Sequence, residues 1–336
     1  MSNFWCRKEF LATGVKNVKL IIQVPCYEEA DTLGITLSEL PREVPGFDSV
    51  EWLIIDDGSS DDTAAVARRH GVDHVIRHQV NRGLAEAFMS GIDACLRLDA
   101  DVIVNTDADN QYHAGDIPAL TAPVLAGEAE IVIGARPIAE TEHFSWVKKR
   151  LQHLGSWAVR IASHTKVADA PSGFRAMSRE AATRLHVFNG YTYTLETIIQ
   201  AGQSNMRVIS VPVRTNADLR PSRLVKSISS YVKRSLLTIL RMFVVYRPLA
   251  FFAWLGSLFF AAGFVAGFRF LFFYLNGTGS GHVQSVVFSA LCIIVGLMLS
   301  MIGLIGDLIA TNRKLLERID VRLQRLERES LPADRS

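Results

Sequence analysis

The sequence has almost no net charge and few cysteines, and both scarcities exclude classes of protein. Its 36 Lys and Arg residues nearly balance its 34 Asp and Glu residues, which leaves a formal charge of +2 over 336 residues. This balance gives no broad positive field, so the composition predicts no nucleic acid partner. The four cysteines show no metal or redox spacing, which fits a reducing compartment. They are Cys6, Cys26, Cys95 and Cys292.

A secretory signal is also missing, because the opening MSNFWCRKEF holds no apolar stretch with a small-residue cleavage site. We therefore expect the polar part of the chain to stay in the cytoplasm. Long apolar runs occur instead at 249–275 and 283–309, each longer than the ~20 residues that span a bilayer. The link between the two runs has no Lys or Arg, whereas Arg241 and Arg247 precede the first run and Arg313 follows the second. The positive-inside rule predicts a transmembrane hairpin with both ends in the cytoplasm.

The regions around these runs complete a four-part organisation. We expect a cytoplasmic domain at 1–224 and two transmembrane helices within 248–310. Residues 225–247 space Lys and Arg among Ile, Leu and Val at helical intervals, which predicts an amphipathic helix on the membrane surface. Residues 311–336 predict a charged cytoplasmic helix that either stays exposed or pairs with a second copy in a homo-oligomer.

Short runs rich in Val and Ile alternate with helix-length segments between residues 19 and 213. This alternation predicts an α/β fold with a mostly parallel sheet and helices on both faces. In such sheets ligands bind beyond the carboxyl ends of the strands. The predicted strands lie at 18–25, 52–56, 73–77, 101–107, 130–136 and 208–214. The predicted helices lie at 29–40, 61–70, 84–98 and 116–125.

Asp107 and Asp109 follow one of these runs, in the sequence VIVNTDADNQY. Carboxylates separated by one residue can face one cation, and hard oxygen ligands suit Mg²⁺ or Mn²⁺. Gln111 offers a further neutral oxygen. Such a metal would also bind the diphosphate of a nucleotide sugar and neutralise the departing nucleoside diphosphate. A D-x-D tripeptide alone is more often a solvated loop, but its place after a buried strand favours the metal site.

Two other strand ends carry polar clusters. Asp56 and Asp57 can accept hydrogen bonds from a base or a ribose, while the Ser and Asp residues that follow them fit helix caps. After the first strand, Pro25 stiffens the exit, Tyr27 can stack on a base, and Glu29 can bind a ribose. Glu29 also suits a helix N-terminus through the helix dipole, and both roles are compatible.

These three patterns, in this order, resemble the family 2 glycosyltransferases, which have the GT-A fold. The segments PSGFRAMSRE, TYTLETIIQA and RPSRL resemble the polyprenyl-phosphate glycosyltransferases related to dolichol-phosphate mannose synthase. The resemblance covers about residues 20–224, and the two apolar runs fit the subgroup that carries its own anchor. It implies an inverting transfer from a UDP- or GDP-sugar to a polyprenyl phosphate, such as undecaprenyl or dolichyl phosphate, at the cytoplasmic membrane face.

The resemblance also assigns donor roles by position. Pro25, Tyr27, Glu29 and Asp57 match nucleotide-contacting positions, with Asp56 beside them. The metal and diphosphate motif is matched by Asp107, Ala108 and Asp109, with Gln111 following. Arg136 matches a donor-binding arginine.

The acceptor side departs from the family pattern. Ser222 and Arg223 stand where the family usually has Ser-Lys, and arginine keeps the charge and gains a bidentate fork. Ala217 stands where an arginine is common, so Arg214 or Arg220 would have to replace it. The usual Arg and Ser of the acceptor-phosphate region align with Lys149 and His153, and Arg150 lies adjacent.

Asp169 has two interpretations of equal weight: it orients the acceptor or acts as a base, or it pairs with Arg175. A lipid monophosphate is largely dianionic at neutral pH, so it needs no strong base. Transfer to a non-phosphorylated lipid would require Asp169 as the base. A processive polysaccharide synthase is disfavoured because the chain has no Q-x-x-R-W motif. The intact D-x-D and the arginines disfavour a non-catalytic scaffold that only binds sugar nucleotides.

Overall fold

The chain forms two compact units, which are described separately. One comprises Met1–Gln152 and Ser163–Ser222, and the other His153–Ala162 and Arg223–Ser336. The structure, a computed structural model, describes residues 17–137, 165–185, 193–217 and 244–330 together with 159, 160, 163, 187, 237, 240 and 241.

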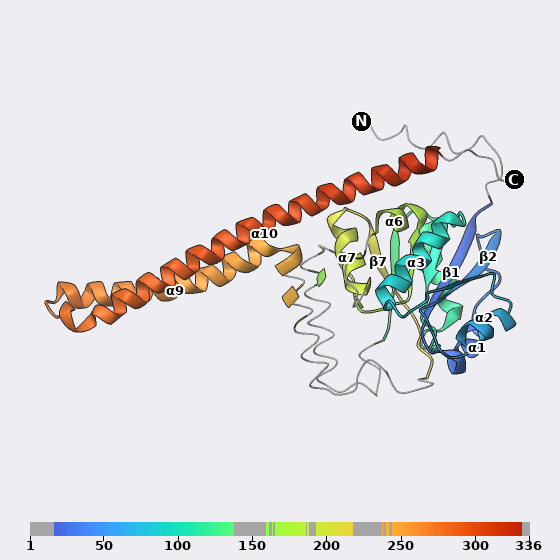
Figure 1. Ribbon diagram of the computed structural model, residues 1–336, viewed down its shortest axis with the longest axis horizontal. Helices are drawn as coiled ribbons and strands as arrows, with labels where there is room; N and C mark the ends of the chain where they lie inside the picture. The colour runs from blue at the N-terminus through green and yellow to red at the C-terminus, as the bar shows by residue number, and fades with distance from the viewer. Residues whose placement is uncertain are drawn as a thin grey trace. The chain divides into compact units, whose positions relative to one another are not determined.

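A seven-stranded sheet with the order β3-β2-β1-β4-β6-β5-β7 forms the centre of the first unit (Figure 1). All neighbouring strands pair in parallel except β6, which is antiparallel to both β4 and β5. The strands are β1 (Lys19–Cys26), β2 (Ser49–Asp56), β3 (His74–Arg77), β4 (Val102–Asn105), β5 (Ile131–Ala135), β6 (Arg175–Ser178) and β7 (Val208–Pro212). The predicted mostly parallel sheet is confirmed, and β6 is a strand that the sequence did not predict.

Helices cover the sheet in the predicted alternation. Leu20, Ile22 and Val24 of β1 belong to a buried cluster to which α1, α2 and α4 contribute. Intervening residues of β1 pack toward α3, where Gly91 lies directly against the Gln23 amide. The described helices of this unit are α1 (Ala30–Glu39), α2 (Thr63–Arg69), α3 (Leu84–Arg97), α4 (Ile117–Leu125), α6 (Arg179–Arg184) and α7 (Tyr193–Gln203), with the 3-10 turn η1 (Ala114–Asp116) before α4.

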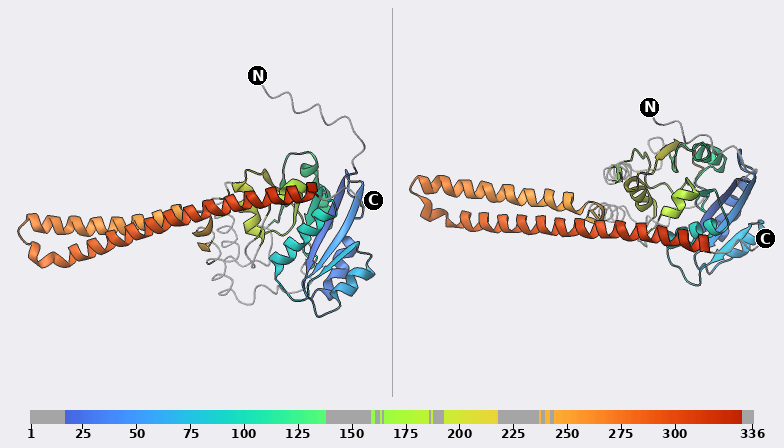
Figure 2. Two further views of the ribbon diagram at one scale, coloured as in Figure 1. Left: turned by 45° about the horizontal axis from the view of Figure 1, so that its top comes forward. Right: turned by 90° about the horizontal axis from the view of Figure 1, so that it is seen from above.

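Two long apolar helices form the second unit, as predicted. The helices α9 (Pro248–Leu275) and α10 (Val283–Ser330) are joined by the 3-10 turn η2 (Gly279–His282) and lie side by side (Figure 2). Glycines allow close packing, because a Cβ added at Gly256 would lie 3.0 Å from the Gly296 carbonyl oxygen. Ser289 Oγ donates a 2.7 Å hydrogen bond to the Gly263 carbonyl. Of the amphipathic helix predicted at 225–247, the structure describes 237, 240, 241 and 244–247 only.

Candidate active site

Residues from separate elements meet at the carboxyl edge of the parallel strands. Tyr27 follows β1, Asp57 follows β2, Asp107 follows β4 and Arg136 follows β5. Because β6 runs the other way, the residues that precede it reach this same edge, among them Gly173. The predicted concentration of polar groups at the strand ends therefore corresponds to one place in the fold.

Asp107 and Asp109 lie partly exposed in the turn after β4. In the described part of the chain, no donor makes a hydrogen bond to the Asp107 carboxylate, while Asp109 Oδ1 accepts one from the Gln111 backbone N–H at 3.2 Å. Burial and then the neighbouring Asp109 raise the pKa of Asp107 to about 7, although Arg136 and Arg175 act in the opposite direction. Two carboxylates so placed fit a hard divalent cation.

A protein-only metal cage is not formed by the residues that the structure describes. No three His, Cys, Asp or Glu side chains among them gather into a metal-binding group. A cation at Asp107 and Asp109 would therefore take its remaining ligands from water or from a bound diphosphate, as Mg²⁺ commonly does in proteins.

Asp169, which precedes β6, forms a buried ion pair with Arg136, which follows β5. Arg136 Nε donates to Asp169 Oδ2 at 2.7 Å, Nη2 donates to Oδ1 at 3.1 Å, and the Arg136 backbone N–H lies 3.3 Å from Oδ2. The two side chains are only 12% and 1% exposed. This bidentate geometry commits both carboxylate oxygens to Arg136. The alternative that Asp169 pairs with Arg175 is wrong.

Arg175 is instead fully buried and bound to neutral oxygens. Its guanidinium donates to the carbonyls of Ala170, Ser172 and Thr194 and to the Thr197 hydroxyl. It thereby joins the segment before β6 to the first turn of α7. From the sequence, Arg175 was considered only as a partner for Asp169 and as part of PSGFRAMSRE, and the spacing gave no sign of the neutral oxygens that it binds.

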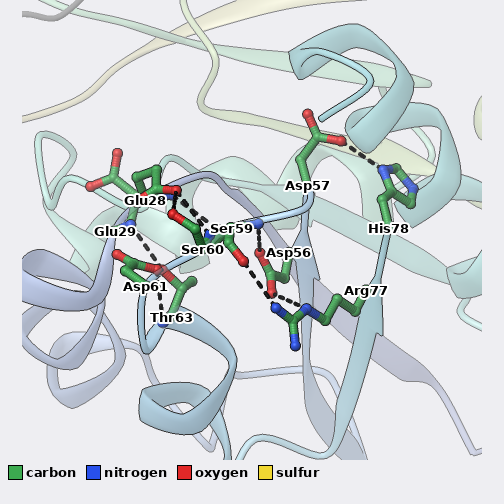
Figure 3. A network of polar contacts seen from close by, with 10 residues as sticks. All are labelled: Glu28, Glu29, Asp56, Asp57, Ser59, Ser60, Asp61, Thr63, Arg77 and His78. Atoms are coloured by element: carbon green, nitrogen blue, oxygen red, sulfur yellow. Dashed lines mark hydrogen bonds and ion pairs between the residues drawn. The ribbon is translucent and has the colours of Figure 1, made fainter. Parts of the chain in front are cut away.

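Asp57 is buried, and its carboxylate points toward His78 (Figure 3). Its Oδ1 accepts from His78 Nδ1 at 2.7 Å and from the Arg82 backbone N–H at 2.9 Å, and its Oδ2 accepts from the Gly83 N–H at 2.8 Å. A carboxylate has about four acceptor positions, so one of them remains for a ligand.

Asp56 is completely buried. Its Oδ1 accepts from the Ser59 N–H at 2.9 Å. Arg77 Nε lies 3.2 Å from Oδ2, but the orientation leaves that oxygen without a hydrogen bond from the described residues (Figure 3). A pocket of about 320 Å³ opens beside these groups, lined by Gly58, Ser59, Arg77, His78 and Gln79.

The residues at the end of β1 differ in accessibility. Pro25 is buried and pairs with Ile55, whereas the Tyr27 side chain is 44% exposed. The Glu29 backbone N–H donates to Thr63 Oγ1 at 2.9 Å, and the Glu29 carboxylate accepts from Thr32 Oγ1 at 2.6 Å. Tyr27 is thus accessible to solvent at the edge, and Glu29 is anchored to the start of α1.

The loop after Asp107 is supported from two sides. The buried Thr36 of α1 donates a 2.8 Å hydrogen bond to the Ala108 carbonyl, and the Asn216 N–H donates to the Gln111 carbonyl at 2.9 Å. Nearby, Arg214 binds Asp116 through Nε at 3.0 Å and Nη2 at 2.6 Å, which leaves the arginine 64% exposed. The other predicted acceptor residues, Lys149, Arg150, His153, Arg220, Ser222 and Arg223, lie outside the described residues.

Comparisons with known proteins agree with this architecture. A family model described as Glycosyl transferase family 2 matches residues 21–185. An uncharacterized glycosyltransferase from Mycobacterium tuberculosis is 31% identical over 194 residues, which cover 57% of this chain and 83% of the relative. The undecaprenyl-phosphate mannosyltransferase of Micrococcus luteus is 26% identical over 206 residues, which cover 58% of this chain and 83% of that protein.

A solved structure shows the same fold. The glucosyl-3-phosphoglycerate synthase of Mycobacterium tuberculosis, solved with Mn²⁺, UDP and phosphoglyceric acid, aligns with a TM-score of 0.51 at 23% identity. The alignment covers 66% of this chain and 78% of that chain, and it identifies the sheet as GT-A-like. With its matching family model, its relatives and its carboxylate-bearing strand ends, this chain belongs to glycosyltransferase family 2.

Proposed function

We propose that this protein transfers a sugar, with inversion, from a UDP- or GDP-sugar to a polyprenyl phosphate at the cytoplasmic face of a membrane. The observation that carries the proposal is the Asp107–Asp109 pair. Burial and repulsion by Asp109 raise the pKa of Asp107 to about 7, and no described residue donates a hydrogen bond to its carboxylate. Such a pair is favourable when a cation and an anionic ligand complete it.

The donor would lie along the carboxyl edge of the sheet, from the loops after β2 and β3 to the residues after β4 and β5. Tyr27 offers an exposed ring for the base, Asp57 retains one acceptor position, and the neighbouring pocket of about 320 Å³ has room for a nucleobase. We assign the ribose to Glu29 and the diphosphate to Arg136 and the loop at Ala108. Pro25 and Asp56, both buried, would shape this subsite from behind rather than touch the nucleotide.

Asp107, Asp109 and the Gln111 side chain would hold Mg²⁺ or Mn²⁺, which would supply charge neutralisation for the departing diphosphate. The acceptor phosphate is itself the nucleophile. One of its oxygens forms the bond to the anomeric carbon while the bond from that carbon to the diphosphate breaks, and no proton has to be removed. Asp169, bound through both oxygens to Arg136, therefore acts in this proposal as the partner that holds a donor-binding arginine.

The lipid acceptor is supported by two observations. One relative is an undecaprenyl-phosphate mannosyltransferase. The apolar helices α9 and α10 are also long enough to cross a membrane. Only 11% and 22% of the residues in their most apolar stretches are buried, whereas the core helix of a soluble protein is mostly buried. We assign residues 1–224 to the catalytic domain, 225–247 to the membrane surface and 248–310 to the membrane. Lys149, Arg150, His153, Arg214, Arg220, Ser222 and Arg223 are proposed to bind phosphate.

The test uses the purified full-length protein with Mn²⁺, polyprenyl phosphate and a panel of labelled UDP- and GDP-sugars. We expect one donor to give a lipid-linked product that mild acid releases, as a sugar phosphodiester should. Asp107→Ala and Asp109→Ala should abolish transfer. A lipid product that mild acid does not release would contradict a sugar phosphodiester product, and failure to transfer from every donor would contradict the proposal.

A further inference from the structure

Gly173 is fixed at the active-site edge through both of its backbone groups. Its N–H donates to the Tyr112 hydroxyl at 3.0 Å, and its carbonyl accepts from Asn105 Nδ2 at 2.9 Å. Tyr112 is buried and stacks on Phe174, with ring centroids 5.0 Å apart. Gly173 therefore has little freedom to move relative to β4.

The Asp107 carboxylate lies directly on Gly173. A Cβ added at Gly173 would lie 2.8 Å from Asp107 Oδ1 and 2.9 Å from Oδ2, and 3.0 Å from the Tyr193 hydroxyl. The carboxylate and this hydroxyl therefore occupy the space that any side chain at 173 would take. Since Gly173 makes no use of a positive φ, the close approach itself explains the need for glycine here.

Asn105 and Tyr193 are themselves immobilised. Asn105 Nδ2 also donates to the Tyr193 hydroxyl at 2.9 Å, and Asn105 Oδ1 accepts from Gln23 Nε2 at 2.9 Å. Both residues are fully buried, and the Tyr193 ring stacks on Phe88 with centroids 4.0 Å apart and planes 7° apart. A satisfied buried network of this kind specifies one arrangement of its members.

We infer that Asn105, Tyr112, Gly173 and Tyr193 form a support, here the Gly173 platform, that positions the Asp107 carboxylate for a divalent cation. Without hydrogen bonds from the described residues, the Asp107 carboxylate is placed by packing on this platform. Gly173 and Tyr193 are thus positioning residues that set the cation affinity of the site. The inference rests on the proposed function only in assuming that Asp107 binds the cation.

The experiment measures Mn²⁺ binding to the purified full-length protein by electron paramagnetic resonance of free Mn²⁺, with Mn²⁺ alone, with UDP and with GDP. Gly173→Ala adds one methyl group against Asp107, and Tyr193→Phe removes one hydroxyl. Changes in groups that orient metal ligands cost about 10- to 100-fold in affinity, so we expect Gly173→Ala to raise the Mn²⁺ dissociation constant by that factor and Tyr193→Phe by about 10-fold. Excess Mn²⁺ should restore sugar transfer in both, but not in Asp107→Ala.

Two matched controls carry the same chemical changes elsewhere. In Gly34→Ala the new methyl group meets the His70 ring at 3.1 Å, and in Tyr274→Phe the removed hydroxyl lies on α9, where the residue is 63% exposed. Both should bind Mn²⁺ like the wild type.

The inference is overturned if Tyr193→Phe and a folded Gly173→Ala both bind Mn²⁺ as tightly as the unaltered protein does. It is also overturned if the unaltered protein binds no Mn²⁺ under any of the three conditions. If thermal unfolding shows that Gly173→Ala does not fold, Tyr193→Phe decides. If the unaltered protein binds Mn²⁺, both substitutions weaken this binding, and yet no sugar is transferred, only the proposed function is contradicted.

Discussion

Asp107→Asn should stabilise the protein in the absence of metal while abolishing its response to metal. The folded state raises the pKa of this carboxyl from 3.8 to about 7, through burial and then through Asp109. At about 1.36 kcal/mol for each pKa unit, the charged form costs about 4 kcal/mol at high pH. Asp107 is partly exposed, and solvent screening reduces this cost to roughly 2 kcal/mol. A gain of that size raises the Tm of a domain of this size by roughly 4–8 °C.

The pH dependence has a definite sign. Because the folded-state pKa lies above the ordinary value, the unfolded chain loses the Asp107 proton first as pH rises, and the wild type loses stability relative to Asp107→Asn from about pH 4 to about pH 7. The Tm difference should grow over this range and stay constant above it.

The assay is thermal unfolding of both detergent-purified proteins with a chelator, at pH 5, 6, 7 and 8, followed by Mn²⁺ addition at pH 8. Mn²⁺ should raise the Tm of the wild type only, since the variant has lost a ligand. A variant that is equally or less stable than the wild type at pH 8 would refute the reasoning, because the Asp107 charge would then carry no cost.

Three further predictions test the surroundings of this carboxylate and the topology. Asp169→Asn leaves the buried Arg136 without its charged partner, so the free energy of unfolding should fall by about 3–5 kcal/mol and the KM for the nucleotide sugar should rise. If kcat fell while stability and KM stayed unchanged, Asp169 would instead act as a base. Thr36→Val removes the hydrogen bond to the Ala108 carbonyl, which should cost about 1–3 kcal/mol in thermal unfolding and raise the Mn²⁺ concentration for half-maximal transfer; no change in either would show that α1 does not support the loop. Gly279→Cys, in the turn between α9 and α10, should react with an impermeant maleimide from outside the cell, and labelling only from the cytoplasm would reject the hairpin topology.

The sheet was largely predictable because six of its strands are rich in Val and Ile, which are buried in the central strands β1 and β4 and only partly buried in the edge strands β3 and β7. β6 was not, since Arg175–Ser178 reads RAMS and has no β-branched residue. Its place between β4 and β5 depends on pairing with residues far away in the sequence. No local pattern at β6 indicates that it runs antiparallel to its neighbours.

In the site, Asp107 and Asp109 could be found because they follow a buried strand directly. Their surroundings could not. The Arg136–Asp169 pair joins two segments that lie 33 residues apart in the sequence, whereas Arg175, which is closer to Asp169 in the sequence, binds neutral oxygens instead. Likewise, the Asp57 carboxylate is oriented by His78, which directly follows β3, and the register between β2 and β3 cannot be read from the sequence.

The reversed direction of β6 has a consequence for how this enzyme can be altered. β5 ends at Ala135 and β6 begins at Arg175 on the same edge of the sheet, so the two ends of the connection between these strands lie at one place. When the two ends of a connecting segment lie close together, a change in the length of the segment costs little in loop-closure free energy. In chimaeras that keep Arg136, Asp169 and Gly173 but replace the residues between the first two, we expect the proposed cation site at Asp107 and Asp109 to be retained, because these carboxylates and Gly173 lie outside the exchanged stretch.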